Sequence, residues 1–165
     1  MELLMFYGFG LLALFAGVAM ITSRQPLTSA LLMILNMFCL AALYALLDAH
    51  LMAVLQLLVY AGAIMVLVLF VIMLLNLREK KGIISRHQAT LQVAGVAAFG
   101  LFVMTVVSKL NAAALPKSKA VSAGFGTVAA VGRTLFTDYI LPFEIASVLL
   151  LAAMVGAVIL AKSKV

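Results

Sequence analysis

The first candidates for chemistry in this 165-residue chain are the polar residues of one long apolar run, Leu51 to Leu77. Gln56 and Tyr60 are four residues apart, so in an α-helix they share a face, which Ala63 continues. Both side chains form hydrogen bonds with water, but neither type is charged at neutral pH. A helix with these residues could gate a chain of water molecules, but it could not itself carry the proton as a charge.

A weak point in the same run lies beside these polar residues. Gly62 destabilises a helix by about 1 kcal/mol relative to alanine, and the whole run would span roughly 40 Å. A long helix with a weakened turn beside polar groups favours a π-bulge. Two interpretations stay open. Either Gln56 and Tyr60 bond neighbouring helices while Gly62 permits close packing, or the segment is a hinge whose rotation makes and breaks a hydrated path.

The other reactive side chains exclude several kinds of site. Cys39 is the only cysteine, which excludes a disulfide within the chain and a cysteine-ligated iron–sulfur cluster. The two histidines, His50 and His87, lack metal-ligand spacing, so no metal site is expected. A self-sufficient proton pump usually buries an acidic residue or a lysine at mid-membrane. None lies deep in the first four apolar runs, so an autonomous transporter is not expected.

Two acidic residues stand where helices are expected to begin. Glu144 falls in the first turn of the last apolar run, where the helix dipole favours a carboxylate. It either has that structural role or contacts a hydrated channel or another subunit. Asp48 precedes the third run and is expected to be its N-cap.

The composition indicates that these residues are placed by membrane-spanning helices. Hydrophobic residues make up 67% of the chain and charged residues 10%, and the mean hydropathy is +1.31, whereas soluble domains are about half apolar and a quarter charged. We expect an all-α integral membrane protein, one domain over residues 1–165, with no extramembrane catalytic domain. The five predicted transmembrane helices are 3–22, 27–47, 51–77, 89–108 and 141–161.

The basic residues indicate the orientation of these helices. Seven of the 11 Lys and Arg residues fall in the 23–26 turn, the 78–88 loop and the C-terminus. The positive-inside rule then places the N-terminus in the periplasm and the C-terminus in the cytoplasm. Because the basic residues stand at the ends of apolar runs, we expect contact with lipid headgroups and no binding of nucleic acid. The long periplasmic loop, 109–140, is expected to contain a short helix over about Thr127–Phe136 on the membrane surface.

Small residues recur at helical spacing in two of the predicted helices. Ala153, Ala157 and Ala161 form one stripe, and Ala13 with Gly17 repeats the spacing. Small residues four apart let helix backbones approach closely in lipid. Packing inside this bundle and docking to helices of other subunits both remain open as their role.

Two segments resemble a known family. The run from Gln56 to Asn76, QLLVYAGAIMVLVLFVIMLLN, closely resembles the third helix of the chain 6 (subunit J) family of NADH:quinone oxidoreductase, respiratory complex I. The segment Ala130–Ala152 is similar to that family's approach to its last helix. The most specific part of the resemblance is Val59–Val66.

The resemblance implies a role in coupling quinone reduction to proton translocation, as a non-catalytic subunit without activity of its own. In this family a π-bulge in the third helix opens or closes a water path. This role is carried over to Tyr60, Gly62, Ala63, Met65, Val66 and Phe70. Gln56 and Glu144 are the candidates for polar groups in the channel. Some members have Glu at the position of Gln56, so a titrating role there is absent from this chain.

The family also implies where this chain works and with what. The expected place is the bacterial inner membrane, among other membrane-arm subunits: the quinone-site subunit and small antiporter-like neighbours. No cofactor is expected on this chain, while NADH, FMN, iron–sulfur clusters and quinone would be bound by other subunits. The alternative is the equivalent subunit of a membrane-bound hydrogenase or a multisubunit cation/proton antiporter.

Overall fold

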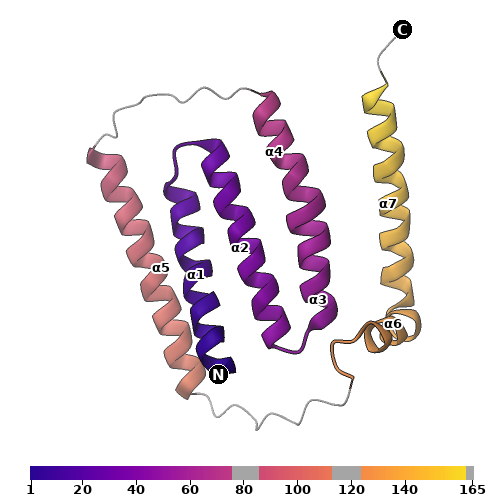
Figure 1. Cartoon of the computed structure of the whole chain (residues 1–165), viewed down its shortest axis with the longest axis horizontal. Helices are drawn as coiled ribbons and strands as arrows, with labels where there is room; N and C mark the ends of the chain where they lie inside the picture. The colour runs from indigo at the N-terminus through magenta and orange to yellow at the C-terminus, as the bar shows by residue number, and fades with distance from the viewer. Residues whose placement is uncertain (76–85, 113–123, 163–165) are drawn as a thin grey trace. The chain divides into compact units, whose positions relative to one another are not determined.

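The computed structural model describes residues 1–75, 86–112 and 124–162, and each regular element in these ranges is a helix (Figure 1). The chain forms two compact units, Met1–Ala123 and Gly124–Val165, which are described separately. The last residues of the predicted third helix (76–77) and most of the basic 78–88 loop lie outside the described residues.

The first unit begins with a helical hairpin. Helix α1 is Glu2–Thr22 and helix α2 is Pro26–Leu46, close to the predicted 3–22 and 27–47. Proline is favoured at the start of α2 because its missing N–H would have no helical partner there. The side chain of Ser29 donates a hydrogen bond to the Met20 carbonyl of α1, at 3.0 Å. The buried residues of the pair are small, which allows the two backbones to pack closely: Ala16, Ala30, Cys39 and Ala41.

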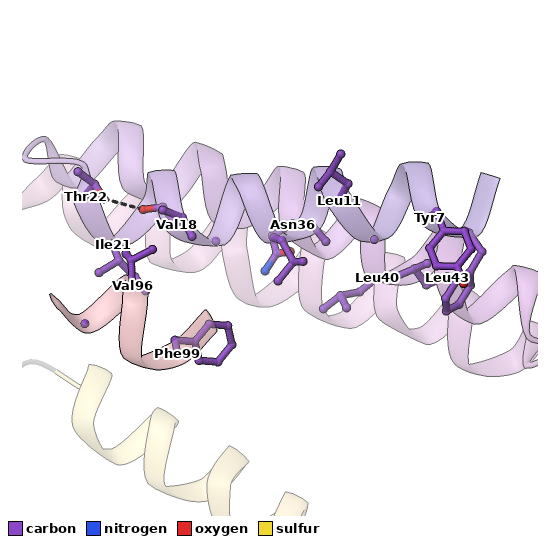
Figure 2. Close-up of a pocket in the computed structure, with 16 residues that line it drawn as sticks. Tyr7, Leu11, Val18, Ile21, Thr22, Asn36, Leu40, Leu43, Val96 and Phe99 are labelled. Carbon is purple, nitrogen blue, oxygen red and sulfur yellow. Dashed lines mark hydrogen bonds between the residues drawn. The ribbon is translucent and has the colours of Figure 1, made fainter. Parts of the chain in front are cut away.

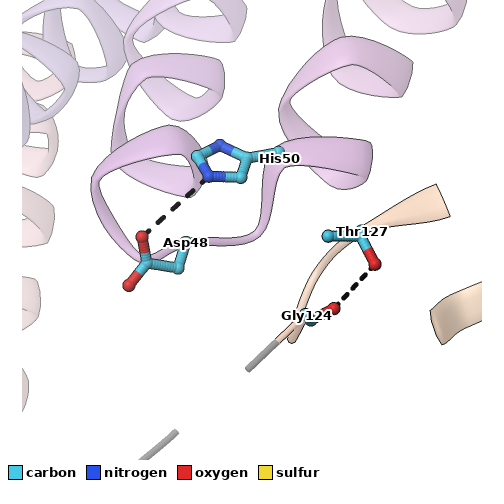
Figure 3. Close-up of polar contacts among 4 residues, drawn as sticks. All are labelled: Asp48, His50, Gly124 and Thr127. Carbon is cyan, nitrogen blue, oxygen red and sulfur yellow. Dashed lines mark hydrogen bonds and ion pairs between the residues drawn. The ribbon is translucent and has the colours of Figure 1, made fainter. Parts of the chain in front are cut away.

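The third helix is continuous but changes its hydrogen-bonding pattern twice. It consists of α3 (His50–Leu55), a π-helical segment η1 (Gln56–Ile64) and α4 (Met65–Leu74), and all three parts pack on α2. The expectation that Asp48 is its N-cap is wrong: the N-cap is Ala49, which makes no side-chain hydrogen bond. Asp48 has a left-handed backbone (φ 58°), and one carboxylate oxygen lies 4.0 Å from Nε2 of His50 (Figure 3).

Helix α5 is Arg86–Ala112, longer at both ends than the predicted 89–108, and its described apolar part is Gly95–Lys109. Over the described ranges, four helices are long and apolar enough to cross a membrane: α1, α2, His50–Leu74 and α7. The fifth span and the orientation remain predictions.

The second unit contains α6 (Val128–Thr137) and α7 (Ile140–Ala161). The expected short helix is thus confirmed, while its position on the membrane surface remains a prediction. Thr127 caps α6 by accepting a hydrogen bond from the Ala130 N–H, and it donates another to the Gly124 carbonyl at 2.7 Å (Figure 3). The rings of Phe136 and Phe143 join the two helices edge to face, with centroids 4.9 Å apart. No residue of α7 is buried.

Candidate functional site

The candidate site is built on the π-helical segment of the third helix. At its beginning the backbone N–H of Gln56 still donates to the Met52 carbonyl, four residues back, as in an α-helix. At its end the N–H of Met65 donates to the carbonyl of Tyr60, five residues back. The π-helical turn is therefore inserted between two α-helical halves of one helix. Such segments are rare and occur frequently at functional sites.

The buried face of the third helix follows this insertion. Its buried residues are Ala53, Gln56, Ala61 and Met65. The intervals before and after the π-helical turn are three and four residues, as in an α-helix, but five residues separate Gln56 from Ala61. The wider turn thus keeps one face of the helix against α2 while changing which residues belong to that face.

The prediction that Gln56, Tyr60 and Ala63 share one face is therefore wrong. Gln56 is buried, with 9% of its surface exposed, whereas Tyr60 is 50% exposed and Ala63 is exposed as well. Across the π-helical segment the buried side passes from Gln56 to Ala61, five residues later, and Tyr60 stays exposed. The hydroxyl group of Tyr60 makes no hydrogen bond to the described part of the chain.

The buried amide of Gln56 has a partner that the sequence did not single out. Its Nε2 atom donates to the sulfur of Met37 on α2, at 2.9 Å. A thioether is a weak acceptor, but a buried donor without any acceptor would be costly. This bond ties the first residue of the π-helical segment to α2. Methionine is an ordinary apolar residue in a membrane helix, so no sequence signal marked Met37.

Gly62 lies where the π-helical turn crowds the backbone. A Cβ atom placed on it would lie 3.2 Å from the carbonyl oxygen of Leu57, five residues earlier. That distance is tighter than most Cβ contacts, so a side chain there would require the turn to open slightly. Glycine thus fits this turn for a steric reason in addition to its low helix propensity.

The remaining third-helix candidates lie beyond the π-helical segment. Met65, Val66 and Phe70 are in α4, so the segment begins and ends earlier than the expected region around Tyr60–Val66. Met65 is buried against the bundle, with 2% exposure, while Val66 and Phe70 are more than half exposed. These two side chains lie in α4, the half of the third helix that follows the π-helical segment.

Glu144 lies on α7, in the second unit. The helix begins at Ile140, one residue earlier than predicted, and its first turn contains no acidic residue. The expectation of a first-turn carboxylate is therefore wrong. The Glu144 carbonyl accepts a hydrogen bond from the Ser147 hydroxyl at 2.7 Å, and its side chain is exposed. Across the described ranges, His, Cys, Asp and Glu form no group of three or more that could hold a metal ion.

Comparison with known proteins identifies the family of this chain. Residues 16–160 match the model of NADH-ubiquinone/plastoquinone oxidoreductase chain 6. The chloroplastic NAD(P)H-quinone oxidoreductase subunit 6 of Staurastrum punctulatum is 37% identical over 92% of this chain and 86% of its own length. The F(420)H(2) dehydrogenase subunit J of Methanosarcina mazei is 36% identical, covering 94% of this chain and 90% of its own length.

A third relative is the NADH-quinone oxidoreductase subunit J of Rhodobacter capsulatus, which is 33% identical over 94% of this chain and 79% of its own length. The family and the long apolar helices make this chain a multi-pass membrane protein, in agreement with the expected bacterial membrane. The chain belongs to the chain 6 (subunit J) family of NADH-quinone oxidoreductases, and it is a subunit of a multi-subunit oxidoreductase complex.

Proposed function

We propose that this chain couples quinone reduction to proton translocation by gating a water path along its third helix. The observation that carries the proposal is the π-helical turn between two α-helical halves. Converting one i→i−5 turn to i→i−4 changes the helix by one residue, and each residue of an α-helix corresponds to a rotation of about 100°. Such a conversion would turn α4 relative to α3 and move Val66 and Phe70 to another side of the helix.

Among the described residues, the side-chain hydrogen bond of the segment lies at its beginning. The bond between Gln56 and Met37 holds the beginning of the segment on α2. Beyond this point Tyr60 is exposed, whereas Ala61 and Met65 are buried, so rotation of α4 would require these two residues to repack on α2. We infer that α3 stays fixed while α4 turns, and that the Tyr60 hydroxyl is a group that a water chain could use.

The proposed role is gating rather than proton transfer by this chain. The amide of Gln56 cannot titrate, and the site contains no acidic residue or lysine. We infer that the chain itself is non-catalytic and binds no cofactor. NADH, FMN, iron–sulfur clusters and quinone would then be handled by other subunits, and the quinone-site subunit and small antiporter-like subunits would be its neighbours.

The first experiment establishes the assembly. The tagged chain is purified in mild detergent, its partners are identified by mass spectrometry, and NADH:quinone activity is assayed. Co-purification with flavin and iron–sulfur subunits, together with that activity, is the expected result. Recovery with hydrogenase or antiporter subunits would overturn the assignment to an NADH:quinone oxidoreductase and would place the same helix in another machine.

The second experiment tests the gate in the assembled complex. Gly62→Ala adds the Cβ that would crowd the Leu57 carbonyl, while Gly8→Ala adds a Cβ that meets nothing within 4 Å. Protons translocated per electron are measured in sealed membrane vesicles. A lower ratio for Gly62→Ala alone is expected, and equal ratios for both variants and the unaltered complex would contradict the gate.

A further inference from the structure

A hollow in the first unit lies away from the π-helical site. It is an open cavity of about 1100 Å³ between α1 and α2, bordered on a third side by Val96 and Phe99 of α5 (Figure 2). Its wall is almost wholly apolar, and Asn36 of α2 is the one side-chain amide in it. Figure 2 shows the nitrogen of this amide pointing into the cavity.

Asn36 lies at the depth where a polar group is most difficult to satisfy. It is the central residue of the 21 in α2, which places it about 15 Å along the helix axis from either end. Its side chain makes no hydrogen bond to the described part of the chain. Acyl chains have no hydrogen-bonding groups, and headgroups are too distant to reach the bilayer centre. An occupant that satisfies Asn36 would therefore bring a polar group to the middle of the membrane.

The glycines of the cavity wall indicate what kind of molecule approaches. Gly10, Gly17 and Gly95 line the cavity, and a Cβ atom on any of them would meet nothing within 4 Å. Packing within the described part of the first unit therefore does not require glycine at these positions, although glycine weakens each helix. On α1, Gly10, Ala13 and Gly17 together leave a smooth surface of the kind on which a second helix backbone packs closely.

We propose that this cavity is the docking site for a transmembrane helix of another subunit of the complex, whose polar side chain bonds Asn36 at mid-membrane. A helix about 10 Å in diameter would fill 1100 Å³ with about two and a half turns, which is enough to match Gly10 and Gly17 with Asn36 between them. The proposal rests on the chain being a subunit of the complex. It does not rest on the gate.

Photo-crosslinking in the intact complex tests the occupant. Benzoylphenylalanine is placed at Leu14, which lines the cavity, and as a control at Phe15, which is on α1 but outside it. We expect position 14 to crosslink to a transmembrane segment of one other subunit, located by mass spectrometry, and position 15 not to give that product. Adducts only with lipid, with a second copy of this chain or with α5 would overturn the proposal.

A second set of variants measures what the contact contributes to assembly. Asn36→Leu removes the amide at similar size, and Gly17→Val fills the cavity, whereas Gly8→Val on the same helix lies outside it and is equally open. We expect Asn36→Leu to lower the fraction of the chain in the complex by roughly threefold to tenfold, the range of one interhelical hydrogen bond in a membrane, and Gly17→Val to lower it further.

The outcome for the control decides the interpretation. Unchanged assembly of Asn36→Leu and Gly17→Val, or an equal loss for Gly8→Val, would contradict a specific docking site. An incorrect gating proposal would give a different result. Proton translocation would then be normal in a fully assembled complex that carries the Gly62 variant.

Discussion

Two side-chain amides on neighbouring helices of this chain have opposite environments. Gln56 on the third helix is buried and bonded to the sulfur of Met37. Asn36, the residue next to Met37 on α2, faces the α1–α2 cavity and has no partner in the described residues. Successive residues of an α-helix point about 100° apart. Helix α2 therefore has one side, with Met37, against Gln56 and another side, with Asn36, against the cavity.

The difference separates two tasks of a small membrane subunit. A polar group satisfied within the chain fixes one element on another, and here it fixes the start of the π-helical segment. A polar group left open at mid-membrane requires a partner from elsewhere and therefore favours assembly. On this interpretation, variants around Gln56 should alter coupling and variants around Asn36 should alter assembly.

The largest effect on the coupling side is expected from Gly62→Val. A branched side chain would press on the Leu57 carbonyl, where even a Cβ atom would lie at 3.2 Å, and should fix the segment in one form. We expect coupled turnover to fall roughly tenfold, equivalent to about 1.4 kcal/mol, with normal amounts of assembled complex. Loss of assembly in parallel with turnover would show that Gly62 serves packing, and unchanged turnover would exclude the hinge.

Tyr60→Phe should have a smaller effect of the same kind. It removes only the hydroxyl of a half-exposed ring that has no partner in the described residues. We expect proton translocation to fall, or the transition from the resting to the active enzyme to slow, by about threefold, the size of one hydrogen bond in a membrane. The amount of complex recovered should be unchanged. Normal translocation and a normal transition would remove Tyr60 from the proposed path.

A double-mutant cycle tests whether Gln56 is anchored by Met37. Met37→Leu leaves a buried amide donor without its acceptor and should lower stability by about 1–3 kcal/mol. Adding Gln56→Leu removes the donor too and should recover most of that loss. Thermal inactivation of the purified complex gives all four values. Simple additivity of the two single variants would show that the 2.9 Å contact contributes nothing.

The smallest effect is expected at the α2–α3 turn, which is outside both amide sites. Asp48 and His50 lie 4.0 Å apart, and their side chains are 71% and 64% exposed. Solvent-exposed pairs of this kind contribute little to stability. His50→Ala should therefore leave turnover and assembly within about twofold of the unaltered complex. A large loss in either measurement would mean that this turn contacts a neighbouring subunit.

The positions of the helices could be predicted from the sequence because a helix that crosses the hydrocarbon core of a membrane needs a long apolar run. The predicted starts and ends of α1, α2 and α7 lie within about one residue of those observed. Pro26 marks the start of α2, and the scarcity of charged residues marks all three helices. Even the short helix after Thr127 could be recognised, because its polar and apolar residues alternate with helical period.

The faces of these helices could not be predicted in the same way. A membrane helix is apolar all round, so periodicity of hydrophobic residues carries little information about which side is buried. The π-helical turn then shifts the face by one residue, which separates Gln56 from Tyr60 despite their spacing. A shift of one residue in the start of α7 likewise removed Glu144 from its first turn. Met37 was missed because only three-dimensional proximity reveals its contact.

The π-helical segment also affects how the third helix matches the bilayer. As an α-helix, the 25 residues from His50 to Leu74 would be about 37 Å long, against a hydrocarbon core of about 30 Å. A wider turn rises less per residue, so the observed form is shorter and reduces this hydrophobic mismatch. Reverting to an α-helix would lengthen the helix, at a cost of a fraction of a kcal/mol per Å of mismatch. Bilayer thickness is therefore one of the forces that set the balance between the two forms of this helix.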